Sequence, residues 1–299
     1  MANRGKGAEE RRPRLRRPRL RRPRLRRPRL RPPVALVGVL VLAVLAVDVV
    51  TVADRRGGDP QPTPAELVAS AADAARRAGT SAFELVVTTA VGDQETTVTA
   101  TGVQELGGTR STLRYIFPQP DGTSVPIDAL TDGTMLYLRV PIDRLPATQG
   151  KPWIATDVSR FAPQGPGGQG PEQLAYLEGL ARLGNQVEDL GREEVRSEPT
   201  THLRVDARLD RLVEVVPVGF RSSLEAIGAA GVETVPIEAW IGDDGLPRRV
   251  RTELTVSAAS SVSVLELFDF GAELDVAVPS PEETFVQEDV TTAVTMLVR

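Results

Sequence analysis

The stretch SAFELVVT, residues 81–88, decides the fold, because the hydrophobic pattern of the chain changes its period there. Phe83, Leu85 and Val87 stand at every second position, which places them together on one face of a β-strand. The preceding stretch has helical spacing. Thr63 and Glu66 form a capping-box pattern at its start, and Gly79 follows its end, so a helix is predicted over residues 64–78.

Alternation of the same kind recurs along the rest of the chain. It predicts strands at residues 81–88, 96–103, 112–117, 135–140, 187–195, 200–208, 235–241, 250–257 and 261–270. A hairpin turn is expected around Ser197–Pro199, and Asp243-Asp244-Gly245 marks another turn. Helical patterns also lie at 171–184 and 209–230, the second interrupted near Pro217. Groups of strands separated by single helices indicate an α+β fold with a large antiparallel sheet.

The composition excludes several kinds of chemistry. The chain has 299 residues, 41% of them apolar, but no cysteine, so it has no disulfide, no thiolate metal site and no lipidated lipobox cysteine. His202 is the only histidine, and no glycine-rich phosphate loop or Gly-x-Ser-x-Gly elbow occurs. We therefore expect that the protein is not an enzyme and that it has no metal site and no cofactor.

The net charge of −4 hides two oppositely charged parts. Residues 1–33 hold 15 basic and two acidic residues, a net charge of +13, which leaves −17 for the rest. Arg11–Leu30 is four tandem copies of Arg-Arg-Pro-Arg-Leu, in which frequent proline and dense charge predict a disordered cytoplasmic arm. The cluster Arg11–Arg31 suits anionic lipid headgroups, or is simply a topology signal. It lacks interleaved aromatic residues, so nucleic acid is not expected as a partner.

A hydrophobic segment follows the arm at residues 34–53. It is about long enough to cross a bilayer as a helix, and the positive charge before it predicts a cytoplasmic N-terminus. The alternative is a signal peptide cleaved after Ala53, which would release the protein. The expected organisation is then a linker at 54–62, a folded extracytoplasmic domain at 63–286 and a tail at 287–299.

Several short motifs resemble the LppX/LprG-type lipoproteins of actinobacteria over roughly residues 64–286. Most are turns and strand ends, and their order and spacing carry the likeness. They are Asp132-Gly133 with Leu136-Tyr137-Leu138, Lys151-Pro152-Trp153, residues 187–191 with 200–206, residues 235–240 with 244–249, and Phe268–Gly271 before Val276–Pro279.

This resemblance implies a LolA/LppX-like fold, in which a curved antiparallel sheet, a half-barrel, wraps over a few helices. It also implies a hydrophobic cavity for the acyl chains of envelope lipids, whereas periodicity alone favours an ordinary core. The chain departs from the family in lacking the lipobox cysteine, which the segment 34–53 would replace as an anchor. A sensor or interaction module of the cell envelope is the alternative function. The residues expected to line the cavity are Phe83, Leu85, Val87, Leu113, Tyr115, Phe117, Leu136, Leu138, Leu203, Val205, Ile237 and Leu254.

Overall fold

The computed structural model describes residues 63–119, 121–159, 187–215, 225, 227–229, 231–256 and 259–298. The predicted arm, the segment 34–53, the linker and the predicted helix at 171–184 lie outside these residues. Within the described ranges, no helix is both long enough and apolar enough to span a bilayer.

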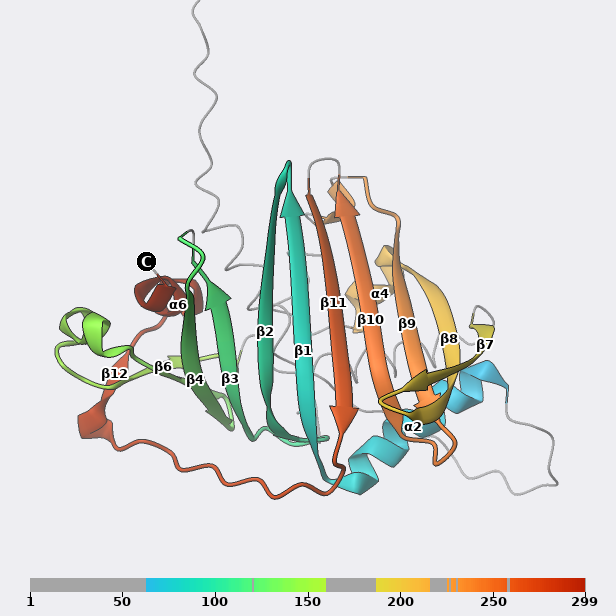
Figure 1. Cartoon of the computed structure of the whole chain (residues 1–299), viewed down its shortest axis with the longest axis horizontal. Coiled ribbons are helices and arrows are strands. Elements are labelled where there is room, and N and C mark those ends of the chain that lie inside the picture. The colour runs from blue at the N-terminus through green and yellow to red at the C-terminus, as the bar shows by residue number, and fades with distance from the viewer. Residues whose placement is uncertain are drawn as a thin grey trace, which may run out of the picture. The chain divides into compact units, whose positions relative to one another are not determined.

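Twelve strands form one large, curved, open sheet (Figure 1). Their order across the sheet is β12-β6-β5-β4-β3-β2-β1-β11-β10-β9-β8-β7. The strands are β1 (Thr80–Val91), β2 (Gln94–Glu105), β3 (Ser111–Pro118), β4 (Ser124–Asp132), β5 (Met135–Arg139), β6 (Trp153–Asp157), β7 (Glu188–Val195), β8 (Glu198–Arg208), β9 (Thr234–Gly242), β10 (Pro247–Val256), β11 (Ala259–Phe268) and β12 (Thr284–Val286). All neighbours are antiparallel except β12, which runs parallel to β6 and so departs from the predicted all-antiparallel sheet.

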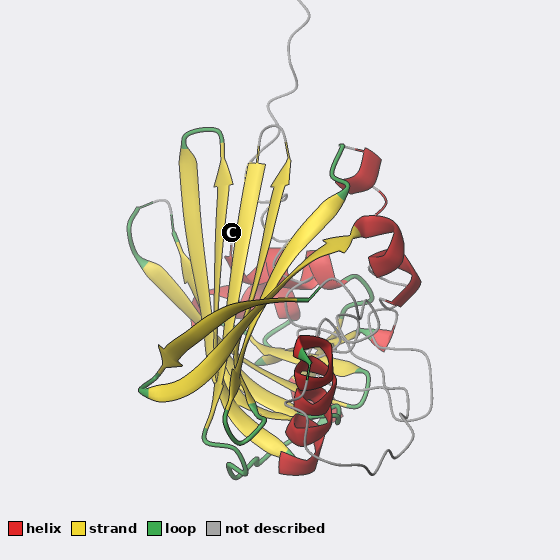
Figure 2. Cartoon of the chain, turned by 90° about the vertical axis from the view of Figure 1, so that its right-hand side faces the viewer, coloured by secondary structure: helices red, strands yellow, loops and turns green. Residues whose placement is uncertain are grey.

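The described helices lie against one face of this sheet (Figure 2). They are α2 (Pro64–Ala78), α4 (Leu209–Val215) and α6 (Val290–Val298), with 3-10 turns η1 (Ile142–Thr148) and η4 (Pro281–Glu283). Helix α2 begins as predicted, since the Thr63 amide donates to Glu66 Oε2 at 2.8 Å and the Glu66 amide donates to Thr63 Oγ1 at 3.3 Å. Its buried stripe contacts β1, β9 and β10, whereas α6 contacts β6 and η1.

Some observed elements were not among those predicted. Strands β4, β6 and β12 are additional, and residues 290–298 of the expected tail form α6, whose side chains join the core of the domain. The hairpin between β7 and β8 closes at Arg196 and Ser197, one residue earlier than expected, because Val195 pairs with Glu198. Both turn residues have positive φ, 50° and 65°, which is the backbone that suits a two-residue hairpin turn.

Burial alternates strictly along β1, as the period of two requires. We call the face that carries Phe83, Leu85 and Val87 the inner face, because the core cluster of the protein forms there together with residues of α2, α4 and α6. The opposite, outer face carries none of the described helices (Figures 1 and 2). One sheet therefore presents two chemically different surfaces.

Candidate functional site on the inner face of the sheet

Strand register places the predicted lining residues on one surface. Eleven of the twelve are buried on the inner face, and Leu254 is half-buried and packs against the same cluster. Two neighbouring cross-strand rows form the centre of this surface. The first is Leu265, Leu85, Ala100, Tyr115 and Ile127, and the second is Leu267, Phe83, Gly102, Leu113, Ala129, Leu138 and Ile154. The residues are thus brought together, and their contact with a ligand remains a prediction.

The inner face is uncharged across its first six strands. Every inward position of β1 to β6 holds an apolar residue, a glycine or a neutral polar residue. Burial raises the pKa of the Tyr115 phenol, so this side chain also stays neutral. The middle of this surface is recessed between larger side chains, because it is formed by the small residues Ala100, Gly102 and Ala129. This surface is suited to uncharged, chain-like apolar groups and unsuited to ions.

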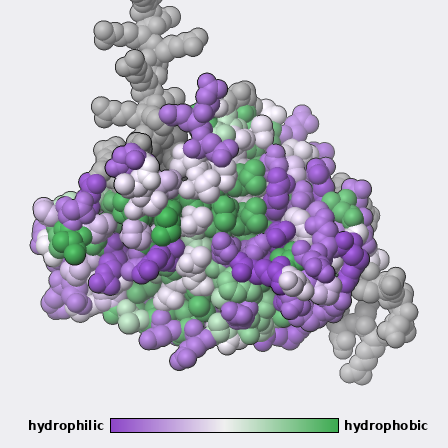
Figure 3. Space-filling model, viewed as in Figure 1, coloured by the Kyte–Doolittle hydropathy of each residue, from purple (hydrophilic) through white to green (hydrophobic). Residues whose placement is uncertain are grey.

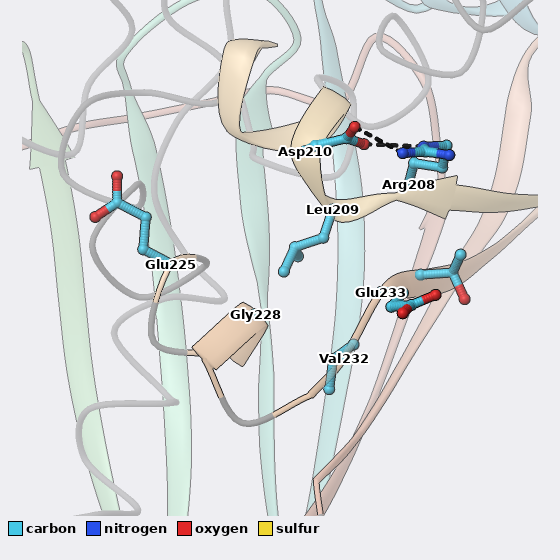
Figure 4. A pocket seen from close by; sticks show the side chains of 8 residues that line it. Arg208, Leu209, Asp210, Glu225, Gly228, Val232 and Glu233 are labelled. Atoms are coloured by element: carbon cyan, nitrogen blue, oxygen red, sulfur yellow. Dashed lines mark hydrogen bonds and ion pairs between the residues drawn. The ribbon is translucent and has the colours of Figure 1, made fainter.

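A pocket of about 480 Å³ opens where β8 passes into α4 (Figure 4). Leu209, a member of the core cluster, lines it opposite Gly228 and Val232. Its rim is charged, and there the Arg208 guanidinium donates to the carboxylate of Asp210 at 3.1 and 2.9 Å. The pocket therefore places a residue of the core cluster beside charged side chains.

The outer face shows hydrophilic side chains between more hydrophobic bands (Figure 3). One cross-strand row contains Phe268, Ala82, Val103, Thr112, Leu130 and Tyr137, and another contains Val264, Val86, Thr99, Ile116 and Pro126. The row between them is largely ionic: Arg249 donates to Glu266, and Arg114 to Asp128. The Arg114–Asp128 pair is exposed and so contributes little stability, and the charges keep the face water-compatible.

His202 lies on this outer face, on the side of β8 opposite to Leu203 and Val205, and it is buried, with 8% exposure. Its ring stacks on Trp240 with centroids 4.0 Å apart, and its nitrogens lie 3.1 Å from Glu193 Oε1 and 3.3 Å from Glu238 Oε2. Glu193 also accepts a hydrogen bond from Trp240 Nε1 at 2.8 Å. Glu193 itself is exposed, and from β7 it bridges the two rings of this aromatic pair.

The Glu193 carboxylate makes stability depend on pH. The hydrogen bond from Trp240, and then that from His202, hold its pKa below the ordinary value of 4.5. A lowered pKa stabilises the fold above the unfolded value, and the contribution is lost as the pH falls below it. Below pH 4.5 we expect the Glu193→Gln variant to lose less of its unfolding temperature per pH unit than the wild type.

Thermal unfolding followed by circular dichroism across this pH range measures the effect. Glu194→Gln, an exposed change at the next position of β7, is the matched control and should reproduce the slope of the wild type. Equal slopes for all three proteins would contradict the role given to Glu193.

Asp243 and Asp244 form a turn, as expected, and they bind separate arginines: Arg192 at 2.7 Å and Arg248 at 2.7 Å. Among the described residues, no group of three or more potential metal ligands occurs. The sequence pattern did not predict the charged pocket rim, because the residues of the rim come from β8, α4 and the segment before β9.

Comparison with known proteins gives structural similarity only. No family model and no curated protein matches the chain. LprF from Mycobacterium bovis is 15% identical, with a TM-score of 0.42, over 75% of this chain and 99% of that one. The Mycobacterium tuberculosis lipoprotein LppX, of the family that the sequence motifs resemble, is 12% identical, with a TM-score of 0.43, over 73% of this chain and 100% of that one. These identities and TM-scores are too low to transfer a function to this chain.

Proposed function

We propose that the protein binds envelope lipids, without catalysis, by holding their acyl chains against the inner face of the sheet. The observation that carries this proposal is the uncharged inner face of β1 to β6, on which most of the predicted lining residues lie. Burial of acyl methylenes there would stabilise the complex by about 0.8 kcal/mol each. The pocket beside Leu209 supports the proposal, because a residue of the core cluster and a polar rim line it together.

We further propose that the domain is tethered to the cell membrane outside the cytoplasm. Segment 34–53 would be the single membrane span, and Arg11–Arg31 would lie on the cytoplasmic side against anionic headgroups. The mass of the protein extracted from its own membrane tests this arrangement. A mature chain that begins after Ala53 would overturn the tether and leave the lipid-binding proposal standing.

Two substitutions test the lipid-binding proposal. Each replaces a half-buried apolar side chain by glutamine, one on the inner face and one on the outer face of the sheet. Leu254 is half-buried on the inner face of β10, and Val262 is half-buried on the outer face of β11. We expect Leu254→Gln to weaken binding of a fluorescent fatty-acyl probe to the delipidated full-length protein about tenfold, since it removes apolar contact area. Val262→Gln should bind like the wild type.

Fluorescence titration of the probe gives these affinities, and thermal unfolding shows that both variants are folded. If the wild type takes up no acyl probe, the lipid-binding proposal is wrong. If both variants bind equally well, the inner face is not the binding surface.

A further inference from the structure

A third row on the inner face is polar, although it adjoins the apolar row of Phe83 and Leu113. Strand register aligns one residue from each of six neighbouring strands, β1 to β6. The row consists of Ser81, Gln104, Ser111, Thr131, Leu136 and Thr156. Ser81 and Thr156 are fully buried, and Gln104 is 7% exposed. A row of hydroxyl and amide groups thus lies at one end of an otherwise apolar surface.

Only the middle of this row is satisfied internally. Ser111 Oγ and Thr131 Oγ1 share a hydrogen bond of 2.8 Å. By contrast, Ser81 Oγ, Gln104 Nε2 and Thr156 Oγ1 are buried and have no hydrogen-bond partner in the part of the chain that the structure describes. A buried polar group without a partner costs about 1–3 kcal/mol, and most buried polar groups in proteins have one. Three such groups in a single row call for a partner from outside the chain.

Ser81 and Gln104 form the strongest candidate pair. They face each other directly across β1 and β2, so their side chains start about 5 Å apart. The serine hydroxyl and the glutamine amide can each donate a hydrogen bond, and neither is charged. No charged residue occupies the row, so a phosphate or carboxylate would stay uncompensated there. Two neutral donors at this spacing can both donate to the carbonyl oxygen of an ester or amide, which accepts two hydrogen bonds.

The surroundings show how the rest of such a ligand would lie. The next inward residues along β1 after Ser81 are Phe83, Leu85 and Val87, spaced about 6.7 Å apart. An acyl chain whose carbonyl lies at Ser81 and Gln104 would therefore run over these side chains in turn. We infer that Ser81 and Gln104 form a subsite for the ester or amide carbonyl that links the acyl chain to the rest of the lipid. This inference rests on the proposed lipid binding and adds the position and chemistry of the linkage.

Two lipids with identical chains test the subsite, a diacylglycerol and the matching ether-linked dialkylglycerol, which lacks the carbonyl oxygens. We expect the wild-type full-length protein to bind the diacylglycerol about fivefold to tenfold more tightly, as expected for one hydrogen bond gained in a buried site. The double variant Ser81→Ala/Gln104→Met should bind both lipids with equal affinity. Binding is measured by competition with a fluorescent acyl probe.

Thr101→Val is the matched control, because it removes a hydroxyl from the exposed, outer side of β2 and should keep the preference for the ester. The double variant removes two unpartnered polar groups, so its unfolding temperature should equal or exceed that of the wild type, which shows that it is folded. Equal binding of both lipids by the wild type would overturn the subsite and indicate internal water in the row. Failure of the wild type to bind either lipid would instead overturn the lipid-binding function.

Discussion

Replacing Gly102 by alanine is expected to lower the free energy of unfolding by about 3 kcal/mol, since overpacking against rigid backbone is costly. A Cβ atom at this position would lie 2.1 Å from the carbonyl oxygen of Thr112 and 2.7 Å from the Cα of Leu113. Both atoms belong to the backbone of β3, so the clash is relieved only by separating β2 from β3. Urea denaturation of the wild type and the variant at one pH measures the loss.

Gly133→Ala is the matched control for this prediction. Gly133 has a positive φ of 63°, but an added Cβ would meet no atom within 4 Å. Its alanine variant should lose only the cost of a left-handed backbone, about 1 kcal/mol. If Gly102→Ala costs no more than Gly133→Ala, the close approach of β2 and β3 in this structure is wrong.

The sheet was largely predictable because its signal is local. A period of two fixes which side chains share a face, and a shift of one residue would reverse the faces of a whole strand. Thus Phe83, Leu113 and Leu203 lie on the same side of the sheet although they are far apart in the sequence. The long, strongly alternating strands β1, β9 and β10 were found for this reason. The neighbours of each strand follow from hairpin turns such as Asp243-Asp244-Gly245.

The missed elements have weaker or misleading local signals. Pro126 argues against a strand in β4, yet it is tolerated because β5 pairs only with residues 129–132. Helix α6 did carry a signal, since Asp289 accepts from the Thr292 amide at 2.7 Å as an N-cap residue, and apolar residues follow at helical spacing. The burial of His202 could not be predicted, because it depends on β7 and Trp240.

The candidate site shows the same division between local and non-local information. The apolar lining residues were predicted from alternation alone, but the polar row was not. Ser81 and Gln104 are ordinary strand residues when each is viewed in its own segment. Only the register of β1 against β2 places them together, and only their burial without a partner marks them as a candidate subsite. The pocket rim beside Arg208 is likewise formed by residues from three separate segments, so no single segment predicts it.

Leu85→Ala is expected to have a large effect that depends on the ligand. Leu85 is 4% exposed at the centre of the inner face, between Leu265 and Ala100. Its truncation should lower the free energy of unfolding of the delipidated protein by about 3 kcal/mol, because the lost contacts leave a cavity. Val86→Ala, at the next position on the outer face, should cost less than about 1 kcal/mol. Urea denaturation of both variants and the wild type gives these values.

Saturating acyl ligand should change the stability cost of Leu85→Ala but not that of Val86→Ala. If the acyl chain lies against the inner face, its methylenes can fill the void left at Leu85, and the variant then gains more from ligand binding than the wild type does. The cost of Leu85→Ala should therefore shrink when a medium-chain fatty acid ester is added, whereas the cost of Val86→Ala should stay constant. An unchanged cost at Leu85 would mean that the ligand binds away from this row, and would require a different surface for the acyl chain.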